Sequence, residues 1–140
     1  SSKINLPVWL SISCAMNFNE GKLMHGYQES VTNSKAHFYD YLENSLLKFT
    51  QLHKGPISVA HSDIKVTGEA VKILKKVHKG PIGAYPNNGY FEKPNWKLVD
   101  DISPSSYLQE AKSWVSNGAQ IIGGCCGVGP DKIKAISVLK

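Results

Sequence analysis

The chain has 140 residues, of which 41% are hydrophobic and 19% are charged. These values are typical of one globular domain, so we expect residues 1–140 to form a single domain rather than a disordered or fibrous chain. The 16 basic residues are scattered lysines, and a net charge of +5 without arginine favours a solvated lysine face over a nucleic-acid site. No apolar run approaches the ~20 residues that span a bilayer, and the first residues carry no apolar signal segment. We therefore expect a cytoplasmic protein with no membrane partner.

The first third of the chain is expected to contain a strand, a loop and a helix. The segment Pro7–Cys14 is apolar, aromatic and β-branched, which predicts a buried strand. The segment Asn17–Gly26 is polar and contains glycine, which predicts a loop. A helix is predicted over Ser34–Gln51, because its apolar residues recur at spacings of three and four. They would form one stripe of Phe38, Tyr41, Leu42, Leu46 and Phe49.

A short internal repeat follows. The sequence His-Lys-Gly-Pro-Ile occurs at His53–Ile57 and again at His78–Ile82. In each copy the glycine ends a helix, the proline turns the chain, and an apolar strand begins. The predicted strands are Ile57–His61 and Ile82–Tyr85, and a helix is predicted between them over Thr67–His78. A period of about 25–30 residues indicates a βα unit.

The last third of the chain completes the pattern. A long loop is predicted over Pro86–Ile102, which is rich in asparagine, glycine, proline and aromatic residues. Ser103 and Pro104 are typical of the start of a helix, and Asn117-Gly118 of its end. A strand over Gln120–Gly124 and a helix from Gly129-Pro130-Asp131 follow. The residues expected to face inward on these two helices are Leu108, Ala111, Trp114, Val115, Ile133, Ile136 and Leu139.

Strands and helices therefore alternate through four βα units. Strict alternation predicts an α/β fold with a parallel sheet and helical crossovers, either doubly wound or a barrel. Four units correspond to half of an eight-stranded barrel.

The segment Gly123-Gly124-Cys125-Cys126-Gly127 lies between the last strand and the last helix. In parallel α/β proteins this end of the sheet carries the functional site. The glycines allow a sharp turn, so that both cysteine side chains can reach the same side and bind one soft metal, for which zinc is the expected ion. The alternative is two small buried residues beside a tight turn.

A third metal ligand is available in His61, which ends its own predicted strand. If that strand is parallel to the last one, His61 and the cysteine pair lie at the same end of the sheet. Two thiolates, one imidazole and one open position form a known catalytic zinc arrangement. The alternative is a hydrogen-bonded structural histidine. The weaker candidates are His25, His37, His53, His78 and Cys14, the last of which we interpret as a buried small hydrophobic residue.

The sequence Tyr85-Pro86-Asn87-Asn88-Gly89 begins another loop at the same end of the sheet. Its asparagine side chains could bind a polar substrate. The alternative is ordinary turn chemistry, because asparagine and glycine both tolerate left-handed backbone conformations.

Several of these segments resemble one known family. The double-cysteine segment with the preceding Trp114–Ile122 resembles the zinc-dependent homocysteine S-methyltransferases. That family includes betaine–homocysteine methyltransferase and the homocysteine domain of cobalamin-dependent methionine synthase. Tyr85-Pro86-Asn87 with Gly89 resembles its next most typical segment, and Pro7–Cys14 resembles the fifth strand of its barrel. The resemblance extends over nearly the whole chain.

The resemblance implies a parallel (βα)4 half of a TIM (βα)8 barrel. Such a half would be completed by a homodimer or by a missing N-terminal half. It implies zinc as cofactor, held in the family by three cysteines, of which two match Cys125 and Cys126. The pair Ala60-His61 occupies the position at which the family has its third cysteine, so His61 is the expected third ligand. Because a neutral imidazole replaces a thiolate, the site has one negative charge fewer.

The resemblance also implies the reaction. Zinc would bind homocysteine and lower the pKa of its thiol, and the thiolate would accept a methyl group to give methionine. The methyl donor would be a sulfonium, a quaternary ammonium or a methylated cofactor, and no general base would be required. Tyr85, Asn87 and Gly124 are the expected substrate-binding residues.

Two other classes of function stay open from the sequence. One is a catalytically inactive or incomplete zinc-binding half-barrel that serves as a scaffold. The other is a different barrel enzyme that uses His61 and Asp63 in acid–base chemistry without a metal.

Overall fold

The computed structural model describes residues 6–28, 36–92, 95–98 and 102–139. Its centre is a parallel sheet with the strand order β1-β5-β6-β9, in which neighbours are hydrogen-bonded. These strands are β1 (Leu10–Ile12), β5 (Ile57–Asp63), β6 (Ile82–Asn87) and β9 (Ile121–Ile122). The helices of the described residues are α1 (Leu42–Leu52), α2 (Ile64–Val77), α3 (Pro104–Ser116) and α4 (Pro130–Ile136). The α/β class and the parallel sheet predicted from the alternating pattern are therefore confirmed.

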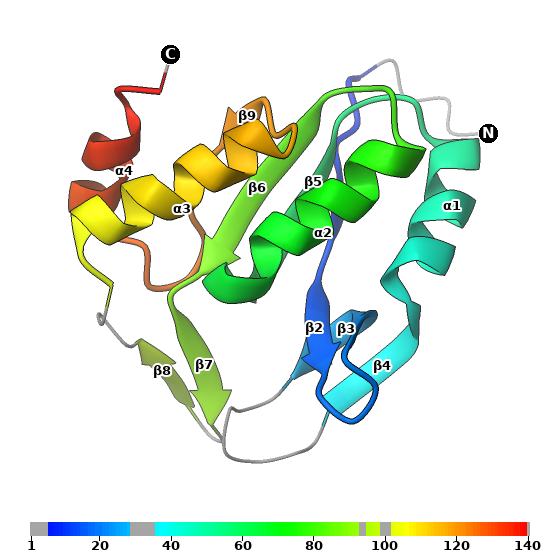
Figure 1. Cartoon of the computed structure of the whole chain (residues 1–140), viewed down its shortest axis with the longest axis horizontal. Coiled ribbons are helices and arrows are strands. Elements are labelled where there is room, and N and C mark those ends of the chain that lie inside the picture. The colour runs from blue at the N-terminus through cyan, green and yellow to red at the C-terminus, as the bar shows by residue number, and fades with distance from the viewer. Residues whose placement is uncertain (1–5, 29–35, 93–94, 99–101, 140) are drawn as a thin grey trace.

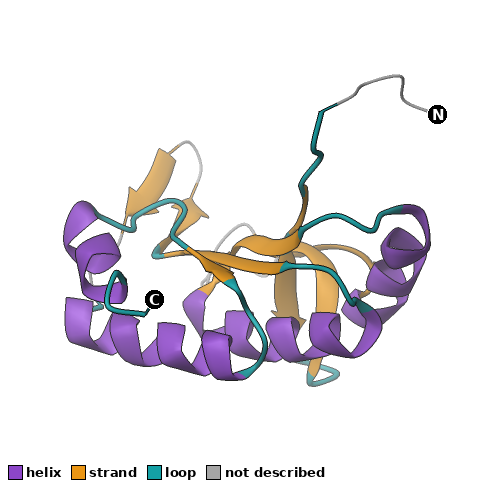
Figure 2. Cartoon of the chain, turned by 90° about the horizontal axis from the view of Figure 1, so that it is seen from above, coloured by secondary structure: helices purple, strands orange, loops and turns teal. Residues whose placement is uncertain are grey.

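The helices pack on one face of this sheet, as Figure 2 shows from above. The strand residues on that face are fully buried against side chains of α2 and α3. Burial of this apolar surface is the main driving force that holds the helices on the sheet. The core residues of the two central strands are Ile57, Val59, Ile82 and Ala84, and those of the helices are Ala70, Val71, Leu74, Ala111 and Trp114.

The opposite face of the sheet is not covered by a helix of the described residues (Figure 2). Tyr85 lies on this face, beside Ser58 and Gly83, and its ring centroid is 6.5 Å from that of Trp9. The strands β1 and β9 are the two edges of the sheet. The described residues thus form an open sheet, and its completion to a barrel by a second copy or a preceding half stays a prediction.

The repeat is confirmed as two equivalent strand entries. Ile57 of β5 pairs with Ile82 of β6, so the two copies lie side by side in register. The C-terminal cap of each preceding helix is the histidine, His53 or His78, and not the glycine that was expected to end it. The histidine ring of each copy contacts the glycine two residues later, which is Gly55 or Gly80. Both histidines therefore lie at the amino ends of the strands, away from the predicted metal ligands.

The region between β1 and α1 differs from the prediction. It forms an antiparallel sheet of β2 (Cys14–Asn17), β3 (Lys22–Gln28) and β4 (Ala36–Tyr41), at the lower right of Figure 1. The predicted loop over Asn17–Gly26 is wrong, because only the four residues between β2 and β3 make a turn. The predicted helix over Ser34–Gln51 is wrong in its first part, of which residues 34–35 lie outside the described residues. Pairing with β3 makes residues 36–41 extended, and helix α1 begins only at Leu42.

A second hairpin replaces part of the predicted loop over Pro86–Ile102. The strands β7 (Gly89–Glu92) and β8 (Asn95–Leu98) pair antiparallel and continue from the end of β6 (Figure 1). Residues 93–94 and 99–101 of the predicted loop lie outside the described residues.

The helices α3 and α4 begin where Ser103 and Pro130 predicted, but two of their expected inward residues are wrong. Val115 is 43% exposed and Ile133 is 42% exposed. The residues buried in their place are Tyr107 and Lys132. The predicted strand over Gln120–Gly124 is shorter in the structure, because only Ile121–Ile122 belongs to β9.

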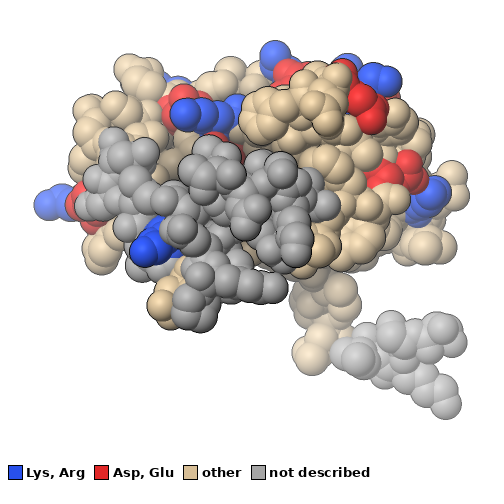
Figure 3. Space-filling model, turned by 90° about the horizontal axis from the view of Figure 1, so that it is seen from below, with Lys and Arg blue, Asp and Glu red and all other residues tan. Residues whose placement is uncertain are grey.

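Charged side chains of both signs are interspersed on the described part of the face drawn in Figure 3. Lys48 pairs with Asp40 at 2.9 Å and Lys72 pairs with Glu69 at 3.4 Å. Exposed pairs of this kind are typical of a solvated surface. Within the described residues, the structure contains no helix with the length and apolar character needed to cross a membrane.

Candidate metal centre

His61 lies in an irregular turn at the carboxyl end of β5. The pairing of β5 with β6 shifts register between Ala60 and Asp63, and His61 has a φ of +50°. Among the described residues it is the one non-glycine residue with a left-handed backbone. This conformation costs about 1–2 kcal/mol for a residue with a Cβ atom. Strain of this kind collects at functional sites, where the surrounding structure maintains it.

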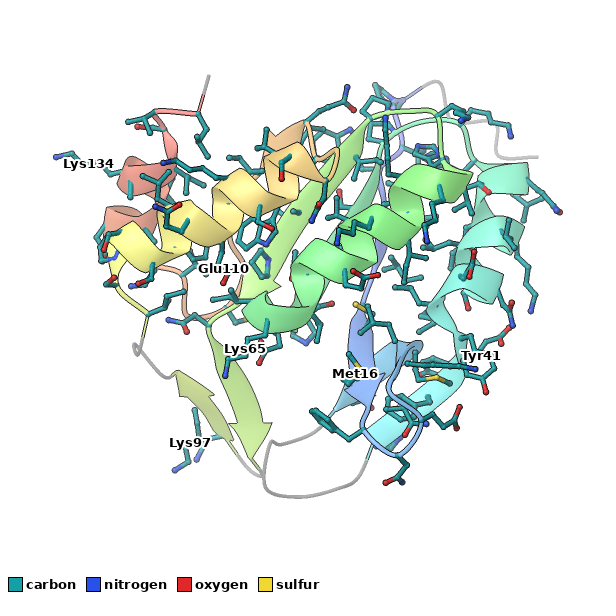
Figure 4. All side chains as sticks on the ribbon, in the orientation of Figure 1. Met16, Tyr41, Lys65, Lys97, Glu110 and Lys134 are labelled. Carbon is teal, nitrogen blue, oxygen red and sulfur yellow. The ribbon has the colours of Figure 1, made fainter. Side chains whose placement is uncertain are left out.

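Neighbouring side chains hold the turn in place. The hydroxyl of Ser62 accepts a hydrogen bond from the backbone N–H of Cys14 and donates one to the carbonyl of Ala60, both at 2.9 Å. The carboxylate of Asp63 accepts from the N–H of Lys65 at 2.7 Å and so caps helix α2, at the corner marked by Lys65 in Figure 4. Because this carboxylate serves as a helix cap, the arrangement does not favour His61 and Asp63 as an acid–base pair.

The cysteine pair is attached to the end of β6 by three backbone hydrogen bonds. The N–H of Gly123 donates to the carbonyl of Ala84 at 3.0 Å, and the N–H of Cys125 donates to that of Pro86 at 2.9 Å. The carbonyl of Cys126 in turn accepts from the N–H of Asn88 at 2.8 Å. The double-cysteine segment and the Tyr85–Gly89 segment are therefore one connected structure.

Gly127 makes this connection possible. Its φ is +77°, and a Cβ atom at this position would collide with the backbone carbonyl of Asn88. We expect Gly127→Ala to destabilise the chain by at least about 1 kcal/mol more than Gly21→Ala. Gly21 is the matched control because its φ is +63° and a Cβ atom there would meet open space. Denaturant unfolding of the two variants measures the difference, and equal losses of stability would contradict the steric argument.

The side chains of His61, Cys125 and Cys126 come together as the sequence predicted. Their ligand atoms all lie within 4.8 Å of one another. The two sulfur atoms are 3.8 Å apart, and the Sγ atom of Cys125 is 4.0 Å from Nδ1 of His61. Tetrahedral zinc with ordinary bond lengths requires about 3.8 Å between two sulfur atoms and about 3.6 Å between sulfur and nitrogen. The donor set therefore fits one zinc ion with small adjustments.

Asn87 joins this group from the end of β6. Its amide nitrogen is 3.3 Å from Nδ1 of His61, and the side chain is only 8% exposed. Its carbonyl oxygen is buried and has no hydrogen-bond partner among the described residues. A buried amide with an unused acceptor beside three metal-ligating atoms indicates a place for a polar ligand.

The other two residues predicted to bind substrate lie close to this group. Tyr85 is half-buried on the open face of the sheet and packs against Gly123. Burial raises the pKa of its hydroxyl. Gly124 precedes the cysteine pair, and a side chain there would collide with Val128.

The thiol of Cys126 is affected by its surroundings and by its neighbour Cys125. Burial, and then a hydrogen bond and charge repulsion from Cys125, raise the pKa of Cys126. A bound divalent cation would oppose this effect, because it favours the thiolate form of its ligands. Cys14 is different: burial raises its pKa to about 11, with a smaller opposing effect from Ser62. The structure thus places Cys14 in the core, in agreement with its interpretation as a buried residue.

Asn88, the second asparagine of the segment predicted to bind a polar substrate, is buried, and its side-chain nitrogen has no partner among the described residues. One residue of this region was not found by sequence reasoning. Tyr107 of α3 is fully buried and donates a hydrogen bond to the carbonyl of Gly123 at 2.6 Å. The only signal for Tyr107 is its position four residues after the cap Ser103, which does not by itself indicate a role.

The fold and these side chains define a parallel α/β protein with a candidate soft-donor metal centre at the carboxyl ends of its strands. Comparison with known proteins identifies the family. The sequence pattern of the homocysteine S-methyltransferases matches residues 1–139. The chain therefore belongs to the homocysteine S-methyltransferase family.

Individual relatives agree with this assignment. Homocysteine S-methyltransferase 2 of Zea mays is 26% identical over 141 residues, which cover 95% of this chain and 36% of the relative. Homocysteine S-methyltransferase 1 of Saccharomyces cerevisiae is 35% identical over 146 residues, which cover 86% of this chain and 44% of the relative. A selenocysteine methyltransferase of Astragalus bisulcatus is 31% identical over 71 residues, covering 49% of this chain and 21% of the relative. The chain spans about two fifths of the length of the first two relatives.

Proposed function

We propose that this chain provides the metal-binding part of a homocysteine S-methyltransferase site. Zinc would be held there by His61, Cys125 and Cys126, and homocysteine would be methylated on sulfur to give methionine. The observation that carries the proposal is the meeting of these three side chains within 4.8 Å, in a chain of this family.

The donor chemistry supports zinc in particular. Two thiolates and one neutral imidazole are soft and borderline ligands, which zinc prefers over the oxygen ligands typical of magnesium or calcium. The amide nitrogen of Asn87 lies 3.3 Å from Nδ1 of His61, and this contact would be given up when Nδ1 binds the metal, because one lone pair cannot serve both partners. Two thiolate charges would balance the charge of the ion, and the fourth position would be open to the sulfur of a substrate.

Zinc bound at this position would act as a Lewis acid and lower the pKa of a coordinated thiol, so that its sulfur is anionic at neutral pH. His61, Cys125 and Cys126 would hold the metal so that the lone pair of the substrate sulfur faces the methyl donor. A new bond would then form between the sulfur and the methyl carbon of the donor. The bond between that carbon and the donor heteroatom would break, with the electron pair leaving on the donor. The thiol proton would pass to solvent, and no general base from the protein is required.

Recognition of the remaining part of the substrate is assigned to the end of β6 and the cysteine segment. We propose that Asn87 uses its unpaired carbonyl oxygen for a donor group of the substrate, such as an ammonium. Tyr85 and Gly124 would line the same space. A relative described as a selenocysteine methyltransferase supports an acceptor of the thiol or selenol class.

A second candidate is a zinc-binding scaffold without activity. Two observations favour it. The chain spans about two fifths of its relatives' length. The described sheet also has two open edges, which leave fewer strands to supply substrate contacts.

One assay separates the two candidates. The purified chain is loaded with zinc and incubated with homocysteine and one donor from each of three classes: a sulfonium, a quaternary ammonium and a methylated cofactor. Methionine is measured by mass spectrometry, and zinc is measured by elemental analysis. The control is the double variant Cys125→Ser, Cys126→Ser, which removes both thiolates.

We expect stoichiometric zinc and methionine formation with one donor class, both lost in the double variant. Zinc binding without methionine from any donor would leave the scaffold as the function of this chain. Absence of zinc binding would refute both candidates.

A further inference from the structure

The segment that leads from β9 to the cysteine pair runs beside β6 but lacks one of the hydrogen bonds expected of a parallel ladder. The N–H groups of Gly123 and Cys125 donate to the carbonyls of Ala84 and Pro86. In a parallel ladder with this register, the carbonyl of Gly123 would accept from the backbone nitrogen of residue 86. Residue 86 is proline, which has no N–H group. The carbonyl of Gly123 therefore has no donor from the neighbouring strand.

Tyr107 of α3 supplies a donor in its place. Its hydroxyl donates to the carbonyl of Gly123 at 2.6 Å, and the side chain is fully buried. Its ring packs edge-on against Trp114 with a centroid distance of 5.4 Å, so the hydroxyl is held in one position. Burial and the nearby Cys125 raise the pKa of this phenol, which keeps it protonated as a donor.

The position of this bond matters because Gly123 lies only two residues before the first of the two cysteine ligands. Gly124 follows, and Cys125 and Cys126 come next. Without a donor, the part-buried carbonyl of Gly123 would lose its hydrogen bond, and a shifted strand end would be favoured. A shift there moves both sulfur atoms relative to His61.

We propose that Tyr107 is a positioning residue for the cysteine pair. Its hydroxyl replaces the ladder donor that Pro86 lacks and thereby fixes the positions of Cys125 and Cys126. This inference rests on the metal site proposed above. It concerns the placement of the ligands and not contact with metal or substrate.

The first test is the zinc affinity of Tyr107→Phe, measured by competition with a chromophoric chelator. We expect a Kd roughly 10- to 100-fold weaker than that of the unmodified chain, the range typical of a lost outer-shell hydrogen bond. The matched control is Tyr41→Phe, which also removes one hydroxyl and its bond to Glu20. Tyr41 lies at the right edge of the molecule in Figure 4, away from Glu110 of α3, so this variant should bind zinc normally.

A rescue variant separates positioning from a general structural role. In Tyr107→Phe with Pro86→Ala, residue 86 regains an N–H group that can donate to the carbonyl of Gly123. We expect the double variant to recover at least half of the lost affinity on a logarithmic scale. A general loss of core packing would not be repaired by a new N–H group on β6. A double variant no better than Tyr107→Phe would overturn the proposal.

A second measurement does not require metal. Amide hydrogen exchange of Cys125, followed by NMR in the metal-free chain, reports whether its bond to Pro86 stays closed. We expect exchange at least tenfold faster in Tyr107→Phe, and slower again in the rescue variant. If the unmodified chain binds no zinc, the proposed function fails and this measurement alone decides the role of Tyr107. Unchanged exchange in Tyr107→Phe would refute that role.

Discussion

Serine in place of both Cys125 and Cys126 should abolish zinc binding by this chain. A serine hydroxyl stays protonated near neutral pH and is a poor zinc ligand, so one imidazole would be left of three donors. The measurement is elemental analysis after purification without chelators. Cobalt substitution provides a second readout, because thiolate ligands give it an intense absorption band. We expect zinc near one equivalent in the unmodified chain and none in the double variant.

The control for this experiment is Cys14→Ala. Cys14 is 2% exposed, and burial raises the pKa of its thiol to about 11, so it is neither accessible nor ionised near neutral pH. The variant should bind zinc normally, and alkylating reagents should modify Cys125 and Cys126 well before Cys14. Loss of zinc from Cys14→Ala alone, with the fold intact, would contradict the assignment of the ligands.

Alanine in place of His61 should weaken zinc binding by more than the roughly 10- to 100-fold that is typical of losing an outer-shell partner. In His61→Ala the metal would keep only two thiolates and water as ligands, which is an incomplete set of protein ligands. In contrast, His61→Cys should preserve or tighten binding, because it restores an anionic third ligand. Affinity is measured for both variants by chelator competition at one pH, since protonation of the ligands competes with the metal.

The backbone at His61 requires its own control. With a φ of +50°, alanine adds conformational strain to the loss of the imidazole. Asparagine tolerates the left-handed conformation better, so His61→Asn removes the imidazole while the turn is retained. We expect His61→Asn to bind zinc as weakly as His61→Ala. If zinc affinity is unchanged in both variants, His61 is a structural residue and the site has no third protein ligand.

The sequence by itself determined the parts of this protein that rest on local chemistry. The cap of α3 at Ser103 and the proline-led strand entries of the His-Lys-Gly-Pro-Ile repeat each follow from a few adjacent residues. Strict βα alternation then predicts a parallel sheet, and a parallel sheet places all strand ends on one side. For this reason the meeting of His61 with Cys125 and Cys126 could be predicted from segments more than sixty residues apart.

Only the tertiary structure decided the antiparallel additions. The apolar spacing predicts a helix over Ser34–Gln51, yet β4 forms because β3 offers a paired edge, and the spacing does not contain that information. The role of Tyr107 is of the same kind. In the sequence, a tyrosine within a predicted helix does not stand out from other core residues. A proline within a predicted strand indicates only that the strand is less favourable at that position. Their connection becomes visible once α3 packs on the sheet and the phenol meets the carbonyl of Gly123, because hydrogen bonds between distant segments depend on three-dimensional position.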